Sequence, residues 1–322
     1  MLAARHKTPV HVHIRPNIAG LNEVLALEHY KGRPTGAVSA LAIEEGTGAL
    51  TRRGDQPSEG GAPCFVSVDR SGRALLVANY AGGSVALLSI QMDYALAPAA
   101  SVVQHPREKD RTPSVRRRRM PTASFRIPPT ASRSPQTSAP TACSFIVSIW
   151  TANRCATSKA GTRYRPGAGP RHIAFHPTLP LVFVANELDS TVAMLRFDST
   201  RGTLSPQDTR STVPAGWTGT NYPADTHVAS NGRTLYVSNR GHNSIAVFSV
   251  AESTGALALD QVVSTEGDWP RNFSLDPSGR WLPVANQRSD SVVVFGRDPD
   301  NGRLTPTHQR IAIPSPVCLR FA

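Results

Sequence analysis

Cysteine is scarce in this sequence of 322 residues, and long apolar runs are missing. The four cysteines are scattered and form no C-x-x-C pair, which argues against a disulfide scaffold and against a zinc site. No apolar run approaches the roughly 18–20 residues of a membrane span. The first residues, MLAARHKTPVHVHIRP, lack the apolar core of a secretory signal, so we expect a cytosolic protein that does not enter a membrane.

Acidic residues are missing from one stretch only, between Arg111 and Asn186. Residues 104–166 hold 13 of the 35 Lys and Arg and two of the 23 acidic residues, which leaves 22 basic and 21 acidic residues elsewhere. The formal net charge of +12 therefore belongs to one segment. No aromatic residues that could stack on bases alternate with its arginines, so we expect no nucleic-acid partner.

Outside that segment the chain repeats a unit of roughly 45–55 residues. Each unit has an apolar alternating run, a tight turn, a second run that ends in V-A-N or V-S-N, and a third run, followed by a weaker fourth. The readable units are residues 62–90, 169–197, 224–250 and 269–297. Four strands per unit at this period predict an all-β protein with the β-propeller fold.

The two ends of the chain read as parts of units. Residues 36–51 have the pattern of the third and fourth strands of an earlier unit, and PSPVCLRFA (314–322) has that of a lone first strand. Propellers commonly close by completing one blade with strands from both chain ends. We therefore expect one domain over residues 1–322, with a closing blade whose N-terminal strands would precede Met1.

Residues 104–166 break the pattern where one whole unit is missing. They read as a disordered, basic Ser/Thr/Pro-rich insertion. The same nucleotides, read one base earlier with suitable synonymous codons from Arg119 to Ser148, can encode H-A-H followed by DPANRFAFAPDLGTDRVFIYRLD. That stretch aligns without a gap on residues 276–298. Our hypothesis is a frameshifted third blade, which leaves no regular blade in this segment.

Repeats separate structural from functional positions without an alignment. An asparagine ends the second run of every readable unit, namely Asn79, Asn186, Asn239 and Asn286, and glycines recur in the tight turns. We expect these to be strand-end and turn residues.

The start of the first run differs between units. Aligned on the turn, one position holds Cys64, Arg171, Asp225 and Arg271. Innermost strands line the channel of a propeller, so Arg171 and Arg271 should converge at one mouth, where two guanidiniums can bind a carboxylate or phosphate. The alternative is a salt bridge between blades.

Glu187 follows the recurrent asparagine in its unit, and a carboxylate near two arginines is a candidate general base or acid. It is equally suited to be their structural counter-ion. His172 and His227 lie near the starts of first runs, where a packing role competes with a catalytic one, and His242 lies in an S-N-R-G-H-N loop. Nucleotide-binding, P-loop and serine-hydrolase motifs are missing.

Several of these motifs resemble the seven-bladed propeller lactonases, typified by propeller-type 6-phosphogluconolactonase and carboxymuconate cyclase. The resemblance covers most of residues 22–322 and is carried by KGRPTGAVSA (31–40), GRALLVANYAGGSVA (72–86), GAGPRHIAFHP (167–177), VANELDSTV (184–192), YVSNRGHNSIAVF (236–248) and WPRNFSLDPSGRWLPVANQ (269–287). It implies seven blades, here with the third disrupted and the closing one incomplete.

The resemblance also implies a site. In that family an Arg of G-P-R-H, a Glu of N-E-L and an Arg of P-R-N-F match Arg171, Glu187 and Arg271, which we take as catalytic. The family's His of H-A-H has no counterpart outside the hypothetical frame, so this chain as written lacks one catalytic group. We expect substrate contacts from the neighbouring polar residues His172, His227, Asn239, Arg240 and Asn272.

The implied reaction is hydrolysis of a small anionic sugar lactone, foremost 6-phosphogluconolactone in the pentose phosphate pathway, without metal or other cofactor. A carboxymuconate cyclase-type lactonising enzyme and a non-catalytic binding propeller are the alternatives. The acidic cluster of calcium-dependent propeller lactonases cannot be assembled from these residues. The oligomeric state is left open.

Overall fold

The computed structural model describes residues 11–14, 23–28, 36–44, 47, 49–68, 72–80, 82–104, 154–157, 160–163, 167–198 and 203–321. Every regular element in these residues is a β-strand, which confirms the all-β prediction. Over the same residues no helix has the length and apolar character needed to cross a membrane.

Twenty of the described strands form five four-stranded antiparallel sheets, each made of four consecutive strands. The first two sheets are β1 (His11–Ile14), β2 (Glu23–Glu28), β3 (Ala37–Ile43), β4 (Leu50–Pro57), then β5 (Pro63–Val68), β6 (Ala74–Asn79), β7 (Ser84–Ile90), β8 (Leu96–Gln104). The other three are β11 (Pro170–Phe175), β12 (Leu181–Asn186), β13 (Thr191–Asp198), β14 (Thr203–Ser211); β15 (Tyr222–Val228), β16 (Thr234–Arg240), β17 (Ser244–Val250), β18 (Leu257–Ser264); and β19 (Pro270–Phe273), β20 (Trp281–Asn286), β21 (Ser291–Arg297), β22 (Leu304–Ala312).

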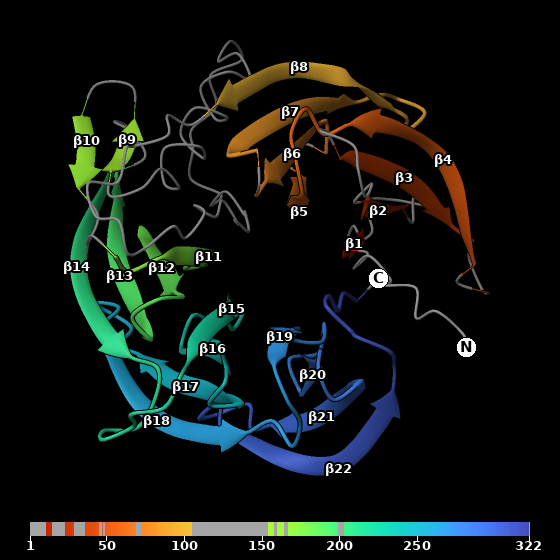
Figure 1. The fold of residues 1–322 in the computed structure, drawn as a ribbon. Coiled ribbons are helices and arrows are strands. Elements are labelled where there is room, and N and C mark those ends of the chain that lie inside the picture. Colours follow the sequence, from red (N-terminus) through yellow and green to blue (C-terminus); the bar gives the residue numbers. More distant parts are fainter. Residues whose placement is uncertain are drawn as a thin grey trace.

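These sheets are the blades of a propeller. Figure 1 shows them arranged around a central axis, with the first strand of each nearest the axis and the fourth on the rim. The repeat units predicted from the sequence match the first three strands of four blades. Residues 36–51 supply β3 and the first two residues of β4, so the fourth strand extends further than the sequence pattern indicated.

The basic segment lies mostly outside the described residues. Its described part forms a separate two-stranded antiparallel sheet of β9 (Arg154–Thr157) and β10 (Ala160–Arg163). Residues 105–153, on which the predictions of a missing blade and a shifted frame rest, are not described, so both stay predictions.

The expectation of a final strand over residues 314–322 is wrong for its described part. Residues 313–321 form no strand. Pro314 and Pro316 lack the N–H that a strand ladder needs, and Ser315, between them, has a left-handed φ of 44° and donates its N–H to Asp290 Oδ1. The segment instead passes near the axis, where the N–H of Leu319 donates to Asn272 Oδ1 at 2.6 Å.

The hydrophobic core lies between neighbouring blades and follows from alternation along each strand. In β12, Phe183 and Ala185 pack with Leu235 and Phe248 of the next blade, whereas Val182 and Val184 pack on the opposite face. The blade of β11–β14 is thus buried on both faces, which explains why its second and third strands are almost continuously apolar.

The turns between the first and second strands use the recurring glycines. Gly72, Gly232 and Gly279 have φ values of 73°, 76° and 69°, a left-handed conformation that costs glycine little. The carboxylate of Asp276 accepts the N–H groups of Ser278 and Trp281 within its turn. The prediction that the recurring glycines are turn residues is confirmed at these three positions.

Candidate active site at the channel mouth

One framework is repeated at the same end of four inner strands. A proline at the start of the strand is paired with the asparagine that ends the second run, sixteen residues later. The pairs are Pro63 with Asn79, Pro170 with Asn186, Pro223 with Asn239 and Pro270 with Asn286.

The asparagines hold this framework together. Their side chains are buried, and those of Asn79, Asn239 and Asn286 donate to backbone oxygens of Ser58, Thr212 and Thr265. Each acceptor directly follows the rim strand of the preceding blade, so the amide joins two blades. The strand-end role is confirmed for these three residues.

Asn239 was expected to contact substrate. Its side chain is 0% exposed, and its amide also contacts Asn221 and Ser244. Asn239 is therefore a structural residue of this framework, and its buried side chain does not reach a substrate.

A β-bulge follows the proline in all four strands, because the register shifts by one residue there. Bulges re-aim side chains at the rims of barrels and near active sites. The residues directly after the proline are Cys64, Arg171, Ala224 and Arg271. The sequence analysis placed Asp225 in this set, but the equivalent residue is Ala224, one position earlier. The error arose because this unit has Ala229 at the position where two other units have the turn aspartate used for the alignment.

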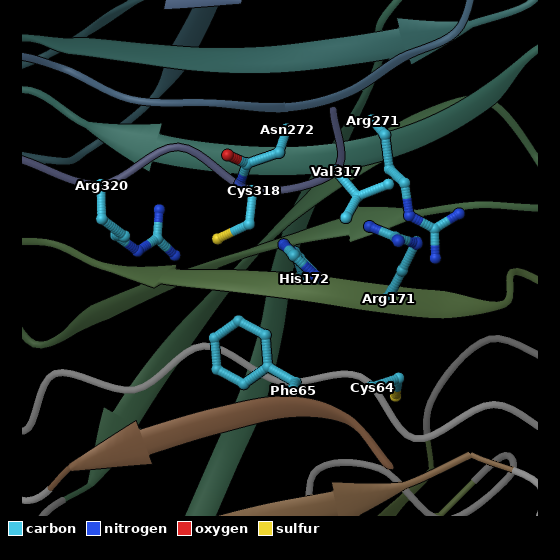
Figure 2. A pocket seen from close by; sticks show the side chains of 9 residues that line it. All are labelled: Cys64, Phe65, Arg171, His172, Arg271, Asn272, Val317, Cys318 and Arg320. Atoms are coloured by element: carbon cyan, nitrogen blue, oxygen red, sulfur yellow. The ribbon is translucent and has the colours of Figure 1, made fainter. Parts of the chain in front are cut away.

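Arg171 and Arg271 converge as predicted. They line one hollow near the axis, where Figure 2 shows their guanidiniums side by side. The hollow is lined by Cys64, Phe65, Arg171, His172, Arg271, Asn272, Val317, Cys318 and Arg320. The C-terminal segment therefore contributes to the site, which the sequence pattern did not reveal.

The two guanidiniums have few partners of their own. Arg171 is buried and donates from Nη1 to Ala224 O at 2.6 Å, whereas Nε of Arg271 is buried without a hydrogen bond. Neither forms an ion pair with a described residue, so the predicted alternative of a salt bridge between blades is not observed there. Burial and the nearby Arg171 lower the pKa of Arg271 to about 10, which leaves it charged at neutral pH. Two adjacent cations in a hollow favour an anionic ligand.

Glu187 lies beside this pair but is bound to a third arginine. Its carboxylate Oε1 accepts a hydrogen bond from Arg240 Nη2 at 2.5 Å, and both side chains are buried. Arg240 also donates from Nε to Tyr222 O. Burial, followed by the field of Arg171, lowers the pKa of Arg240 to about 9, and Glu187 opposes that shift.

The Glu187–Arg240 ion pair joins equivalent positions of adjacent blades, since each residue directly follows the recurrent asparagine. Opposite charges at that position were the signal that could have identified the pair from the sequence. Of the two predicted roles for Glu187, the structure shows a counter-ion, and its partner is Arg240 rather than Arg171 or Arg271.

Asp225 is the centre of a second buried network, one residue further along the inner strands. Its Oδ1 accepts from His172 Nδ1 at 2.6 Å, and its Oδ2 accepts from His227 Nε2 at 3.1 Å and from Asn272 Nδ2 at 2.5 Å. These hydrogen bonds join β11, β15 and β19. The sequence analysis expected substrate contacts from the two histidines and Asn272, but it gave Asp225 no role beyond its place in the alignment of first-run residues.

The network has consequences for protonation. The two histidines and their hydrogen bonds hold the pKa of Asp225 well below its usual range despite burial. Burial and then Arg171 lower the pKa of His172 to about 4, although Asp225 opposes this. At neutral pH, His172 is therefore a neutral imidazole that donates its Nδ1–H to an ionised carboxylate.

His242 lies away from this hollow. Its Nδ1 contacts Ser244 Oγ at 2.8 Å, and its ring packs edge-on against Trp217 with 4.4 Å between ring centroids. Among the described residues, no group of three or more His, Cys, Asp or Glu is arranged to hold a metal ion.

Comparison with known proteins assigns the chain to a family. Residues 22–321 match the family described as lactonase, 7-bladed β-propeller. The chain is a member of this propeller lactonase family. The prediction of the fold class and the recognition of the family from its motifs are thus confirmed.

Individual relatives of this lactonase agree with the assignment. The chain is 34% identical over 325 residues to a 6-phosphogluconolactonase of Bacillus subtilis, covering 99% of this chain and 89% of that protein. It is 30% identical over 283 residues to a 6-phosphogluconolactonase of Cronobacter sakazakii, covering 84% and 77%. The solved structure of a periplasmic gluconolactonase of Pseudomonas aeruginosa superposes with a TM-score of 0.78 and 26% identity, covering 98% of this chain and 89% of that one.

Proposed function

We propose that this lactonase hydrolyses 6-phosphogluconolactone to 6-phosphogluconate. The observation that carries the proposal is a pair of guanidiniums in one hollow at the channel mouth, without an acidic partner among the described residues. They belong to Arg171, which is buried, and Arg271, which is half-buried. The names of the relatives from B. subtilis and C. sakazakii support the same substrate. Small anionic lactones fit such a site because the cations can bind both the phosphate and the charge that develops during the reaction.

In this reaction water attacks the ring carbonyl, and the carbonyl oxygen becomes negatively charged. Arg171 and Arg271 bind the phosphate and stabilise this oxyanion, and Arg320 and the side chain of Asn272 line the same hollow. Glu187 keeps Arg240 in place beside them through its ion pair. We place the reaction in the cytosol and treat it as independent of metal, as the sequence predicts.

A carboxymuconate cyclase-type reaction is the second candidate. The same arginines would bind carboxylates of that substrate, so the hollow alone does not separate two anionic lactones. A non-catalytic propeller would bind such an anion without turnover. Hydrolysis of each lactone by the purified protein separates the three.

The direct test compares Arg171→Gln and Arg271→Gln with Arg280→Gln. Arg280 lies exposed in a turn and keeps total charge matched across the three variants. We expect kcat/KM for 6-phosphogluconolactone to fall by about 10²–10³ in each site variant, as for loss of an oxyanion donor. The Arg280 variant should match the wild type. Equal activity of all four proteins would contradict the proposal.

A further inference from the structure

Lactone hydrolysis needs a group that accepts a proton from water, and the carboxylate of Glu187 is held by Arg240. The site therefore needs another group that can accept a proton from water. His172 lies in the hollow beside Arg171 and Arg271 (Figure 2), and no other histidine of the described residues lines this hollow.

His172 is held in one tautomer and one orientation. Its Nδ1–H donates to Asp225 Oδ1 at 2.6 Å, and Asp225 stays ionised because it accepts several further hydrogen bonds. Phe65 packs edge-on against the imidazole, with 5.3 Å between ring centroids. With the proton fixed on Nδ1, the lone pair is on Nε2.

Nε2 of His172 is available to a ligand. It makes no hydrogen bond to a described residue, and it is not fully buried. The ring lines the hollow that holds the two guanidiniums. The other ionisable groups facing it there are Arg320 and the thiols of Cys64 and Cys318, with His227 on the far side of Asp225.

His227 provides an internal comparison. It also donates to Asp225, but through Nε2, and its ring packs against Phe273 with 4.8 Å between centroids, outside the lining of the hollow. Both histidines stabilise the buried aspartate. Only His172 also presents a free nitrogen to the site.

We propose that His172 is the catalytic base of the reaction and that Asp225 is its positioning residue. This inference rests on the lactone hydrolysis proposed above. Such an aspartate fixes the tautomer of the imidazole and stabilises the imidazolium that forms.

A water oxygen adds to the lactone carbonyl carbon while its proton passes to Nε2, which gives an imidazolium and a tetrahedral oxyanion beside the arginines. The bond between this carbon and the ring oxygen then breaks, and the imidazolium returns the proton to the departing ring oxygen. The products are an open-chain hydroxy acid, which loses its proton to solvent, and a neutral His172.

The test compares His172→Asn with His227→Gln. The amide nitrogen of each new side chain can replace the ring nitrogen that donates to Asp225, so both variants keep the buried network. We expect kcat to fall by about 10²–10⁴ in His172→Asn, the usual range for a general base, with little change in KM. The His227 variant, whose ring lies outside the lining of the hollow, should lose much less of its kcat than His172→Asn. Similar losses in both variants would assign the histidines a structural role and overturn the inference.

The outcomes separate the two proposals. Absence of hydrolysis by the wild type refutes the function itself. A wild type that hydrolyses the lactone beside a fully active His172→Asn refutes only the role of His172. Binding of 6-phosphogluconate to His172→Asn, measured by calorimetry, shows that the anion site is intact.

A second variant covers the case in which His172→Asn does not fold. The pH profile of kcat in Glu187→Gln should keep its acid limb, because His172 still must lose its proton to act. Loss of that limb would assign the base to Glu187 and contradict the inference.

Discussion

Acidification should destabilise this protein through His172. An unfolded histidine binds a proton below a pKa of about 6.5, whereas burial and Arg171 keep the pKa of His172 at about 4 in the folded state. Between these values the unfolded chain binds more protons, so the free energy of unfolding falls as the pH falls. A pKa difference of about 2.5 units at about 1.4 kcal/mol each gives a limit of about 3.5 kcal/mol, most of it lost by pH 4.5.

Urea unfolding of the wild type and of His172→Asn at intervals from pH 7.5 to 4.5 measures this contribution. His176 and His242 also have lowered pKa values, so both proteins lose some stability in acid. The difference between the two curves of unfolding free energy against pH isolates the contribution of His172. The pKa of Asp225 is well below its usual range, so its protonation lowers the stability only at lower pH. We expect the wild type to lose about 2–3 kcal/mol more than the variant. Parallel curves would show that His172 is protonated, or exposed, in the folded protein.

Three further predictions concern the blades, the cofactor and the gene. Asn286→Ala should lower the free energy of unfolding by about 1–3 kcal/mol, because the carbonyl of Thr265 loses its buried donor. An unchanged midpoint of urea unfolding would show that Asn286 does not stabilise the contact between blades. Dialysis against EDTA should leave lactone hydrolysis unchanged, and loss of activity restored by a divalent ion would contradict metal independence. Resequencing the gene should reveal an insertion or deletion near codons 104–166, and an intact single frame would exclude the frameshifted blade.

The sequence predicted the propeller because its repeats supply their own alignment. The same repeats singled out Arg171 and Arg271, since arginine at the bulge is not shared by every blade. Residues that follow the repeat for structural reasons, such as Asn286, could be recognised in the same way.

The side-chain contacts between neighbouring blades could not be predicted from the repeats. The pairing of Glu187 with Arg240, and of His172 with Asp225, depends on how neighbouring sheets face each other, and the pattern within one sheet does not fix this. A one-residue error in aligning the β15 unit was enough to assign Asp225 to the wrong ring of side chains. The C-terminal segment has an apolar pattern that suggests a strand, but Pro314 and the residues after it follow a different path.

The central claim is that Arg171 and Arg271 recognise an anionic sugar lactone. The most direct measurement is the ratio of kcat/KM for 6-phosphogluconolactone to that for unphosphorylated gluconolactone, in the wild type and in the double variant Arg171→Gln/Arg271→Gln. Hydrogen bonds to charged groups contribute about 1.5–3 kcal/mol each, so two arginines predict a wild-type ratio of at least about 10². The double variant should bring the ratio close to one. A wild-type ratio near one, or a ratio that the double variant leaves unchanged, would contradict the account.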